Sequence, residues 1–206
     1  GDKALSVPLY EKIEVVKPGF LNFTLSPAFL AKYCSRMAED DKLGLDPKEG
    51  QTILIDYGGA NVAKPLHVGH LRSASIGETL KRLAIRMGND AVGDVHLGDF
   101  GLQMGLIIGE LEDRGELDKD FTISELEEVY PYASAKAKEK NPDGSLKNEA
   151  YAERAREITV QLQKGVEKYK KAWEKILKVS IADLKKNYGA LDVHFEIWKG
   201  ESDAKP

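Results

Sequence analysis

The sequence has a single cysteine and no long apolar run, and each shortage excludes a class of protein. Cys34 has no partner for a disulfide within the chain, as expected for a protein of the reducing cytosol. No stretch approaches the roughly 18 consecutive apolar residues of a membrane-spanning helix. The first residues, GDKALSVPLY, lack the charged and then apolar layout of a signal peptide. We therefore expect a cytoplasmic protein with no membrane partner.

A large excess of charge of either sign is also absent. The 30 lysines and arginines are balanced by 34 aspartates and glutamates, which gives a net charge of -4. This balance excludes a chain-wide surface for polyanions, but it leaves room for a local basic face. The 42% hydrophobic and 31% charged residues are typical of a globular protein with a packed core.

Residues 1–45 have the pattern of the end of an α+β domain followed by a linker. The stretch KIEVVKPGFLNFTL alternates apolar and polar residues on both sides of a Pro-Gly turn, which predicts a short hairpin. Ser26, followed by proline, is a good N-cap for a helix that ends at about residue 39. The polar segment at 40–50, DDKLGLDPKEG, is the predicted linker, and we place the domain boundary in it between residues 45 and 46.

The next part of the chain alternates predicted strands and helices. In order, these are a strand at 51–59 (QTILIDYGG), a helix from His67 or Val68 to Gly88, a strand at 90–99 (DAVGDVHLGD) and a helix at 100–115 closed by Gly115. This order predicts a parallel βαβ unit with a right-handed crossover. The fold class is therefore α/β, the first half of a Rossmann-type parallel sheet.

A large helical insertion is predicted over about 116–188. It begins with a charged helix capped by Thr122 or Ser124, and a turn follows at 141–145. Apolar residues then recur every three or four positions from about 149 to 187, which predicts one long helix. The last predicted element is a strand, ALDVHFEIW, at 190–198.

The segment ANVAKPLHVGHLRS contains two of the four histidines, His67 and His70, and three explanations compete for them. They could bind zinc together with His96 and Asp99, although no H-E-x-x-H motif or cysteine cluster accompanies them. They could be ordinary polar residues at a helix start. They could also form a cradle for a phosphorylated ligand.

The surroundings of the two histidines favour the phosphate cradle. A strand ending in glycines leads into a helix whose first turn contains Gly69, and helix N-termini in open α/β sheets face anions. The helix dipole disfavours charging the imidazoles, so they would act as neutral N–H donors. Such donors can stabilise the charge that grows on a pentacoordinate phosphorus. Neither G-x-G-x-x-G nor G-x-x-x-x-G-K-[ST] occurs.

The sequence around the two histidines resembles a known family. HVGH resembles the H-I-G-H motif of class I aminoacyl-tRNA synthetases, and the longer string DYGGANVAKPLHVGHLRSASIGE resembles arginyl-tRNA synthetases. HLGDFGLQMG, YAERAREITVQLQKG and FEIWKGESD extend this resemblance from about residue 50 to the end of the chain. It implies that 46–206 is part of a class I catalytic domain. It also implies that 1–45 is the end of an N-terminal tRNA-binding-type domain with its linker.

The resemblance assigns roles to the histidine segment. His67, His70 and Lys64 would be catalytic and, together with Gly69, would bind ATP. Lys64 would contact phosphate in place of the second lysine-rich loop that many members lack. Gly69 would let the adenine pack closely.

The resemblance also assigns an arginine site. The arginine-binding residues would be Asp56, Gly59, Ala60, Asn61 and His70. Asp56 would pair with the guanidinium. The family has Ser-Pro-Asn where this chain has Gly59, Ala60 and Asn61, so the serine hydroxyl and the proline rigidity are lost. Asp99 and Gln103 would either line the same pocket or cap structure.

The implied activity is that of an arginine–tRNA ligase, with ATP, L-arginine and tRNA(Arg) as partners. Mg²⁺ would accompany ATP, without a dedicated protein metal site. The parent protein would be monomeric. The sequence has no K-M-S-K-S-like segment, so we expect this chain alone to be inactive. The alternatives are another H-x-G-H nucleotidyltransferase and a non-catalytic interaction module.

Overall fold

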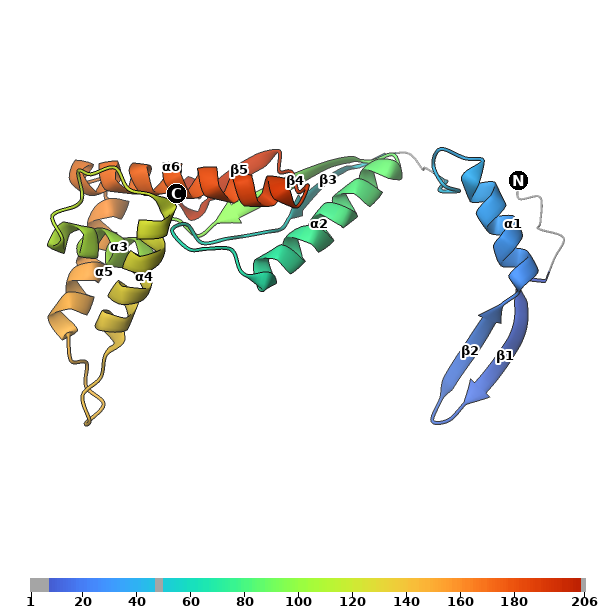
Figure 1. Cartoon of the computed structure of the whole chain (residues 1–206), viewed down its shortest axis with the longest axis horizontal. Coiled ribbons are helices and arrows are strands. Elements are labelled where there is room, and N and C mark those ends of the chain that lie inside the picture. The colour runs from blue at the N-terminus through green and yellow to red at the C-terminus, as the bar shows by residue number, and fades with distance from the viewer. Residues whose placement is uncertain (1–7, 47–49, 205–206) are drawn as a thin grey trace. The chain divides into compact units, whose positions relative to one another are not determined.

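The computed structural model describes residues 8–46 and 50–204, and it contains two compact units. One unit comprises residues up to 50 together with 86–89, and the other comprises 51–85 together with the residues from 90 onward (Figure 1). The predicted domain boundary between residues 45 and 46 stays a prediction, and residues 47–49 of the predicted linker lie outside the described residues. No helix in the described ranges is both long enough and apolar enough to cross a membrane.

The first unit is a hairpin followed by a helix. Its elements are β1 (Tyr10–Val16), β2 (Phe20–Leu25) and α1 (Pro27–Ala38). The strands pair antiparallel, and the Gly19 N–H donates to the Val16 carbonyl at 3.1 Å. The Ser26 hydroxyl accepts from the Phe29 N–H at 3.3 Å and caps α1. Both predicted elements are confirmed.

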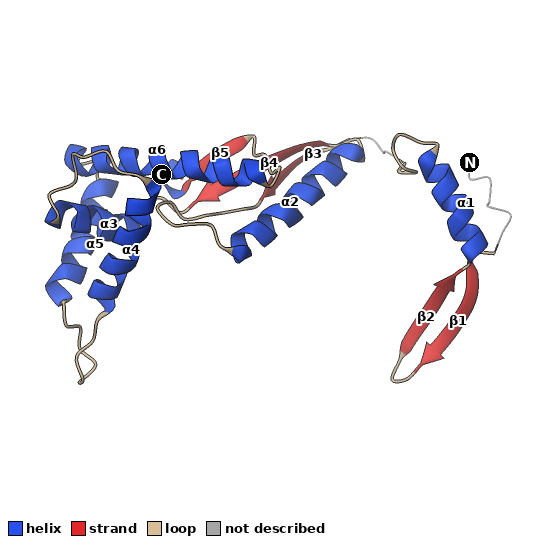
Figure 2. Ribbon diagram, viewed as in Figure 1, coloured by secondary structure: helices blue, strands red, loops and turns tan. Residues whose placement is uncertain are grey.

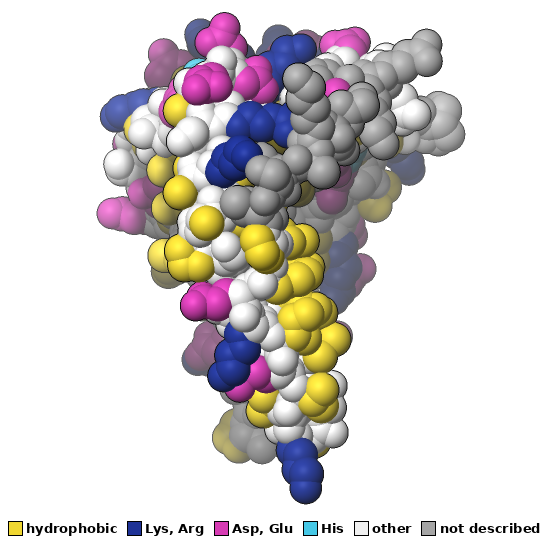
Figure 3. Space-filling view, turned by 90° about the vertical axis from the view of Figure 1, so that its right-hand side faces the viewer, with side chains coloured by type: hydrophobic (Ala, Val, Ile, Leu, Met, Phe, Trp, Pro, Cys, Tyr) yellow, Lys and Arg dark blue, Asp and Glu magenta, His cyan; other side chains and the backbone are white. Residues whose placement is uncertain are grey.

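This unit buries almost none of its apolar side chains. No residue of β1, β2 or α1 is buried, and Val15 and Phe20 are 84% and 64% exposed. Figure 3, which faces this unit, shows hydrophobic side chains gathered along the hairpin. An exposed apolar surface of this kind is normally covered by another part of a protein.

The second unit is built on a parallel sheet in the order β3-β4-β5. Its strands are β3 (Thr52–Asp56), β4 (Asp90–Leu97) and β5 (Ile197–Gly200), and helix α2 (Val68–Arg86) connects β3 to β4. The predicted βαβ unit and the α/β fold class are therefore confirmed. Figure 2 shows the three strands with α2 running alongside them.

Close packing joins α2 to the sheet. A Cβ on Gly77 would overlap the ring of Tyr57, so the glycine lets the helix approach this side chain. The Tyr57 hydroxyl donates to Glu78 at 2.7 Å, and the buried Lys81 lies 3.3 Å from the same carboxylate. Lys81 also reaches Glu196 at 3.0 Å, which joins α2 to the chain just before β5.

Helices form the rest of the second unit. They are α3 (Leu102–Asp113), α4 (Ile123–Lys138), α5 (Glu149–Gln163) and α6 (Glu167–Ala190), followed by the short 3-10 helix η1 (Glu201–Asp203). The predicted Thr122 cap is confirmed, because Thr122 and Glu125 form a reciprocal capping box at the start of α4. Most fully buried side chains belong to one cluster between the sheet and these helices.

Two predictions of element boundaries are wrong, one for a helix and one for a strand. The single helix expected from about 149 to 187 is two helices, because Gly165 takes a left-handed φ of +80° and ends α5. The strand expected at 190–198 starts too early, because α6 continues to Ala190. Asp192, at φ +56°, then turns the chain, and only Ile197–Gly200 pairs with β4.

Candidate functional site

The candidate site lies on the loop between β3 and α2, which several elements hold in place. The Ala63 N–H donates to the Ser180 hydroxyl of α6 at 2.9 Å. The Val62 N–H donates to the Gly98 carbonyl at 3.2 Å, just after β4. The Tyr188 hydroxyl donates to the Gly58 carbonyl. The loop is therefore a fixed part of the core, with Val62 fully buried.

His67 and His70 stand side by side at the start of α2. Their ring centroids are 3.8 Å apart, with an interplanar angle of 33°. The Nδ1 of His70 accepts from the His67 N–H at 3.2 Å, and the Nδ1 of His67 accepts from the Gly69 N–H at 3.1 Å. A neutral imidazole whose Nδ1 accepts a hydrogen bond carries its proton on Nε2. In their neutral forms, both rings therefore offer an Nε2–H donor rather than a lone pair.

The surroundings of His70 favour its neutral form. Burial lowers its pKa below the usual value, and the nearby charges of His67 and Lys64 lower the pKa further. Lys64 precedes the helix and places its ammonium 4.2 Å from the ring centroid of Tyr130. The segment thus presents imidazole N–H donors and a lysine cation close together.

The structure gives a local reason for a glycine at position 69, and the sequence alone did not show it. A Cβ at this position would lie 2.9 Å from Cε1 of the His67 ring. The glycine therefore leaves room for the His67 imidazole. Its predicted contact with adenine stays a prediction.

Asp56 and Asn61 lie at the carboxyl end of the sheet. Asp56 is exposed at the end of β3 and is in register with Asp94 of β4. Asp94 Oδ1 is buried without a hydrogen-bond partner in the described part of the chain, and burial and the charge of Asp56 raise the Asp94 pKa. Asn61 is exposed and bridges to Gly98, and its predicted contact with arginine stays a prediction.

The comparison with known proteins identifies the family at this point. The model of the class I (R) tRNA synthetase catalytic domain matches residues 33–206. The chain belongs to this family. It is 52% identical over 214 residues to the arginine–tRNA ligase of Agathobacter rectalis, a match that covers 96% of this chain and 34% of that protein. It is 49% identical over 215 residues to the arginine–tRNA ligase of Alkaliphilus oremlandii, with 97% and 35% covered.

Solved structures of the same family agree in fold. The arginyl-tRNA synthetase of Plasmodium falciparum matches with a TM-score of 0.59 at 24% identity, covering 94% of this chain and 33% of that one. The arginyl-tRNA synthetase of Thermus thermophilus matches with a TM-score of 0.56 at 20% identity, covering 96% and 30%. This chain spans about a third of the length of these class I synthetases.

The remaining predicted residues of this class I domain make contacts within the fold. Asp99 is 3% exposed, and its carboxylate accepts from the Ser202 N–H at 3.0 Å and from the Ser202 hydroxyl at 2.7 Å. Gln103 donates to the Val62 carbonyl. Gly59 and Ala60 lie on the loop, and Ala60 is buried. The contacts of Asp99 and Gln103 match the capping alternative, and their place in the arginine pocket stays a prediction.

The zinc alternative has no counterpart in the structure. Within residues 8–46 and 50–204, no group of three or more His, Cys, Asp or Glu side chains is placed to hold a metal ion. His96 is exposed on β4, and the Asp99 carboxylate is engaged by Ser202. The set of His67, His70, His96 and Asp99 is therefore not assembled.

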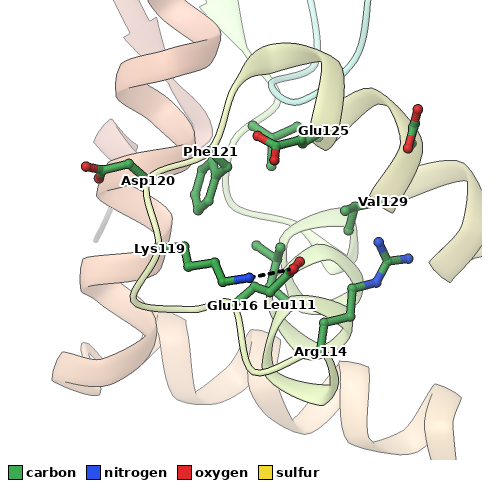
Figure 4. Close-up of a pocket in the computed structure, with 10 residues that line it drawn as sticks. Leu111, Arg114, Glu116, Lys119, Asp120, Phe121, Glu125 and Val129 are labelled. Carbon is green, nitrogen blue, oxygen red and sulfur yellow. Dashed lines mark hydrogen bonds and ion pairs between the residues drawn. The ribbon is translucent and has the colours of Figure 1, made fainter.

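A separate cavity of about 170 Å³ lies between the end of α3 and the start of α4 (Figure 4). Its lining includes Arg114, Lys119, Glu116 and Glu125, around the apolar Phe121. Lys119 pairs with Glu116 at 3.0 Å. None of the predicted site residues lines this cavity, so it is not part of the candidate site.

Sequence reasoning missed the residues that position the loop. Ser180, Tyr188 and Tyr130 come from helices far along the chain, and their spacing is that of ordinary core positions. No feature of the sequence distinguished these three residues from other core positions.

Proposed function

We propose that this chain supplies the ATP- and arginine-binding part of an arginine–tRNA ligase. In the proposed first step, the arginine carboxylate attacks the α-phosphorus of ATP, pyrophosphate leaves and arginyl-adenylate forms. In the second step, the 2′-hydroxyl of the terminal tRNA(Arg) adenosine takes the arginyl group and AMP leaves. The observation that carries the proposal is the His67–His70 pair, with each Nδ1 engaged by a backbone N–H.

The two imidazoles supply donors for the transition state. Their outward Nε2–H groups can donate to the phosphate oxygens as negative charge grows on the pentacoordinate phosphorus. Because the pKa of His70 is lowered, the ring stays a neutral donor and forms no strong ion pair with ground-state ATP. Lys64 adds a cation for the phosphates, and Gly69 leaves the adenine room to pack. Mg²⁺ is part of the substrate as the complex with ATP.

The proposed arginine site lies at the adjoining strand ends. Asp56 accepts from the guanidinium, which matches the geometry of a carboxylate and an arginine fork. The Asn61 amide and the backbone of Gly59 and Ala60 contact the α-amino and carboxylate groups, close to His70. We also infer that the ligase is a monomer in the cytoplasm, where it meets tRNA(Arg).

The test uses a chimeric ligase, the Agathobacter rectalis arginine–tRNA ligase with this chain in place of its matching segment. We expect His67→Ala and His70→Ala each to reduce kcat for arginine-dependent ATP–pyrophosphate exchange by about 100- to 1000-fold, the usual effect of removing one transition-state donor. His194→Ala is the matched control, because this side chain is 63% exposed and comes shortly before β5, at the end of the sheet opposite the candidate site.

Three outcomes contradict the proposal. Exchange that is unaffected by both histidine substitutions removes the transition-state role. Activation of an amino acid other than arginine indicates another nucleotidyltransferase. A chimeric ligase that folds but does not bind ATP indicates a module that keeps only the fold.

A further inference from the structure

Lys64 is held by an aromatic ring from a distant helix. Its ammonium lies 4.2 Å from the ring centroid of Tyr130, which belongs to α4. A lysine ammonium within about 6 Å of a ring centroid is attracted by the negative face of the ring. The flexible four-carbon stem of a lysine otherwise leaves the position of its charge poorly defined.

Both partners sit on rigid supports. Tyr130 is partly buried against the main core cluster, and it follows the buried Val129 on α4, a helix whose start is fixed by the Thr122 capping box. On the other side, Ala63 is 1% exposed, takes a left-handed φ of +56° and donates to Ser180. The backbone that directs Lys64 is therefore fixed from the preceding residue onward.

The charge of Lys64 is felt by both of its neighbours. Burial by itself raises the Tyr130 pKa, but the hydrogen bond and charge of Lys64 bring it below the ordinary value. The same charge contributes to the lowered pKa of His70. The Lys64 ammonium is thus in contact with the α4 tyrosine and near enough to His70 to act on its pKa.

We propose that Tyr130 is a positioning residue that holds the Lys64 ammonium beside the His67–His70 pair for contact with ATP phosphate. The inference rests on the proposed function, because it needs Lys64 to act on ATP. The ring occupies one side of the ammonium and leaves N–H donors free for phosphate oxygens, since an ammonium has three. Helix α4 then determines where the phosphate-binding cation stands.

The test is a double-mutant cycle in the chimeric ligase with Lys64→Met and Tyr130→Leu. We expect Tyr130→Leu to lower kcat for ATP–pyrophosphate exchange by about fivefold, the size of a modest cation–π interaction. In the Lys64→Met background, the same change should have no further effect. Tyr130→Phe keeps the ring and should retain most of the activity. Tyr132→Leu, a 53% exposed tyrosine of the same helix, is the matched control.

A second readout separates positioning from a structural role. If Tyr130→Leu frees Lys64, the His70 pKa in the 206-residue chain should rise toward its usual value, while Tyr132→Leu leaves it unchanged. Equal losses of kcat from Tyr130→Leu with and without Lys64 overturn the inference, as does an unchanged His70 pKa. If the histidine substitutions abolish exchange but Lys64→Met has no effect, the inference fails and the proposed function stands.

Discussion

The pKa of His70 is the most direct reporter on the site at the scale of single residues. Burial and the charges of His67 and Lys64 lower it, so removing either charge should raise it. We expect Lys64→Met and His67→Ala each to raise the His70 pKa in an NMR titration of the 206-residue chain. Lys171→Met, which removes a 69% exposed lysine of α6, should not. A His70 pKa that ignores both substitutions contradicts the proposed cluster.

The sign of this shift sets the pH dependence of exchange. A histidine with a lowered pKa keeps its neutral donor form down through the usual value of about 6.5. We therefore expect the acid limb of kcat for the chimeric ligase to lie below pH ~6.5 and to move to higher pH in the Lys64→Met variant. A pH–rate profile checks this, and an acid limb that stays in place excludes His70 as the titrating group.

Glu78 is a residue-scale test of stability rather than catalysis. Burial raises its pKa, but hydrogen bonds from Arg82, Tyr57 and the His194 N–H, with the charge of Lys81, lower it to about 2. A lowered carboxyl pKa stabilises the fold above the unfolded value of about 4.3, and this contribution is lost as the pH falls toward 2. We therefore expect the free energy of unfolding to fall as the pH is lowered across this interval.

Replacing Glu78 tests the same network at neutral pH. We expect Glu78→Gln to lower the free energy of unfolding by about 3 kcal/mol, the low end for breaking a buried ion pair, since Lys81 keeps Glu196 as a partner. The difference from the parent chain should shrink below pH ~4 in denaturant titrations. Glu167→Gln, 71% exposed, is the control and should change stability by less than about 0.5 kcal/mol.

The sequence predicted the chemical groups at the residue scale better than their surroundings. It placed two imidazoles at a helix start, and the structure shows them there side by side, with ring centroids 3.8 Å apart. It could not predict that each Nδ1 accepts a backbone N–H, because this depends on the conformation of the first turn. It also could not pair Lys64 with Tyr130, since no local pattern encodes contacts between distant segments.

At the scale of elements, the close contact between α3 and α5 can be tested at a glycine. A Cβ on Gly105 of α3 would overlap the Ala155 carbonyl and the Thr159 hydroxyl of α5. Gly105→Ala should therefore force the two helices apart and cost about 1–3 kcal/mol. Gly189→Ala in α6 meets no atom within 4 Å and should stabilise the chain by about 0.5 kcal/mol. Thermal unfolding compares the two variants, and equal effects contradict the packing argument.

Element boundaries were predictable where local chemistry sets them. Ser26 and Thr122 mark their helix starts, because an N-cap satisfies backbone donors within its own turn. The break at Gly165 was missed because apolar residues keep their helical spacing on both sides of it. The late start of β5 was missed because its alternation continues backward, while Arg82 and Glu78 hold the preceding turn by tertiary contacts.

At the scale of the whole molecule, the sequence could not predict how much apolar surface stays exposed. Periodicity says which side chains share a face, but not whether that face is covered. Leu54 on β3 is 62% exposed, and Ile76 and Leu80 on α2 are 54% and 51% exposed. Strand β3 also pairs only with β4 in the described part of the chain.

This exposed surface and the length of the relatives lead to the last prediction. We expect the 206-residue chain alone to show no ATP–pyrophosphate exchange, even with tRNA(Arg) added, whereas the chimeric ligase exchanges. The physical reason is that the chain spans 34% of the A. rectalis ligase, and that β3 pairs only with β4 in the part of the chain that the structure describes. A transition-state donor that stays in contact with bulk water stabilises developing charge far less than one in a dry site.

The measurement is radioactive pyrophosphate exchange with a His67→Ala/His70→Ala double variant as control. Exchange by the chain above that control would show that its own residues suffice to enclose the reacting phosphate.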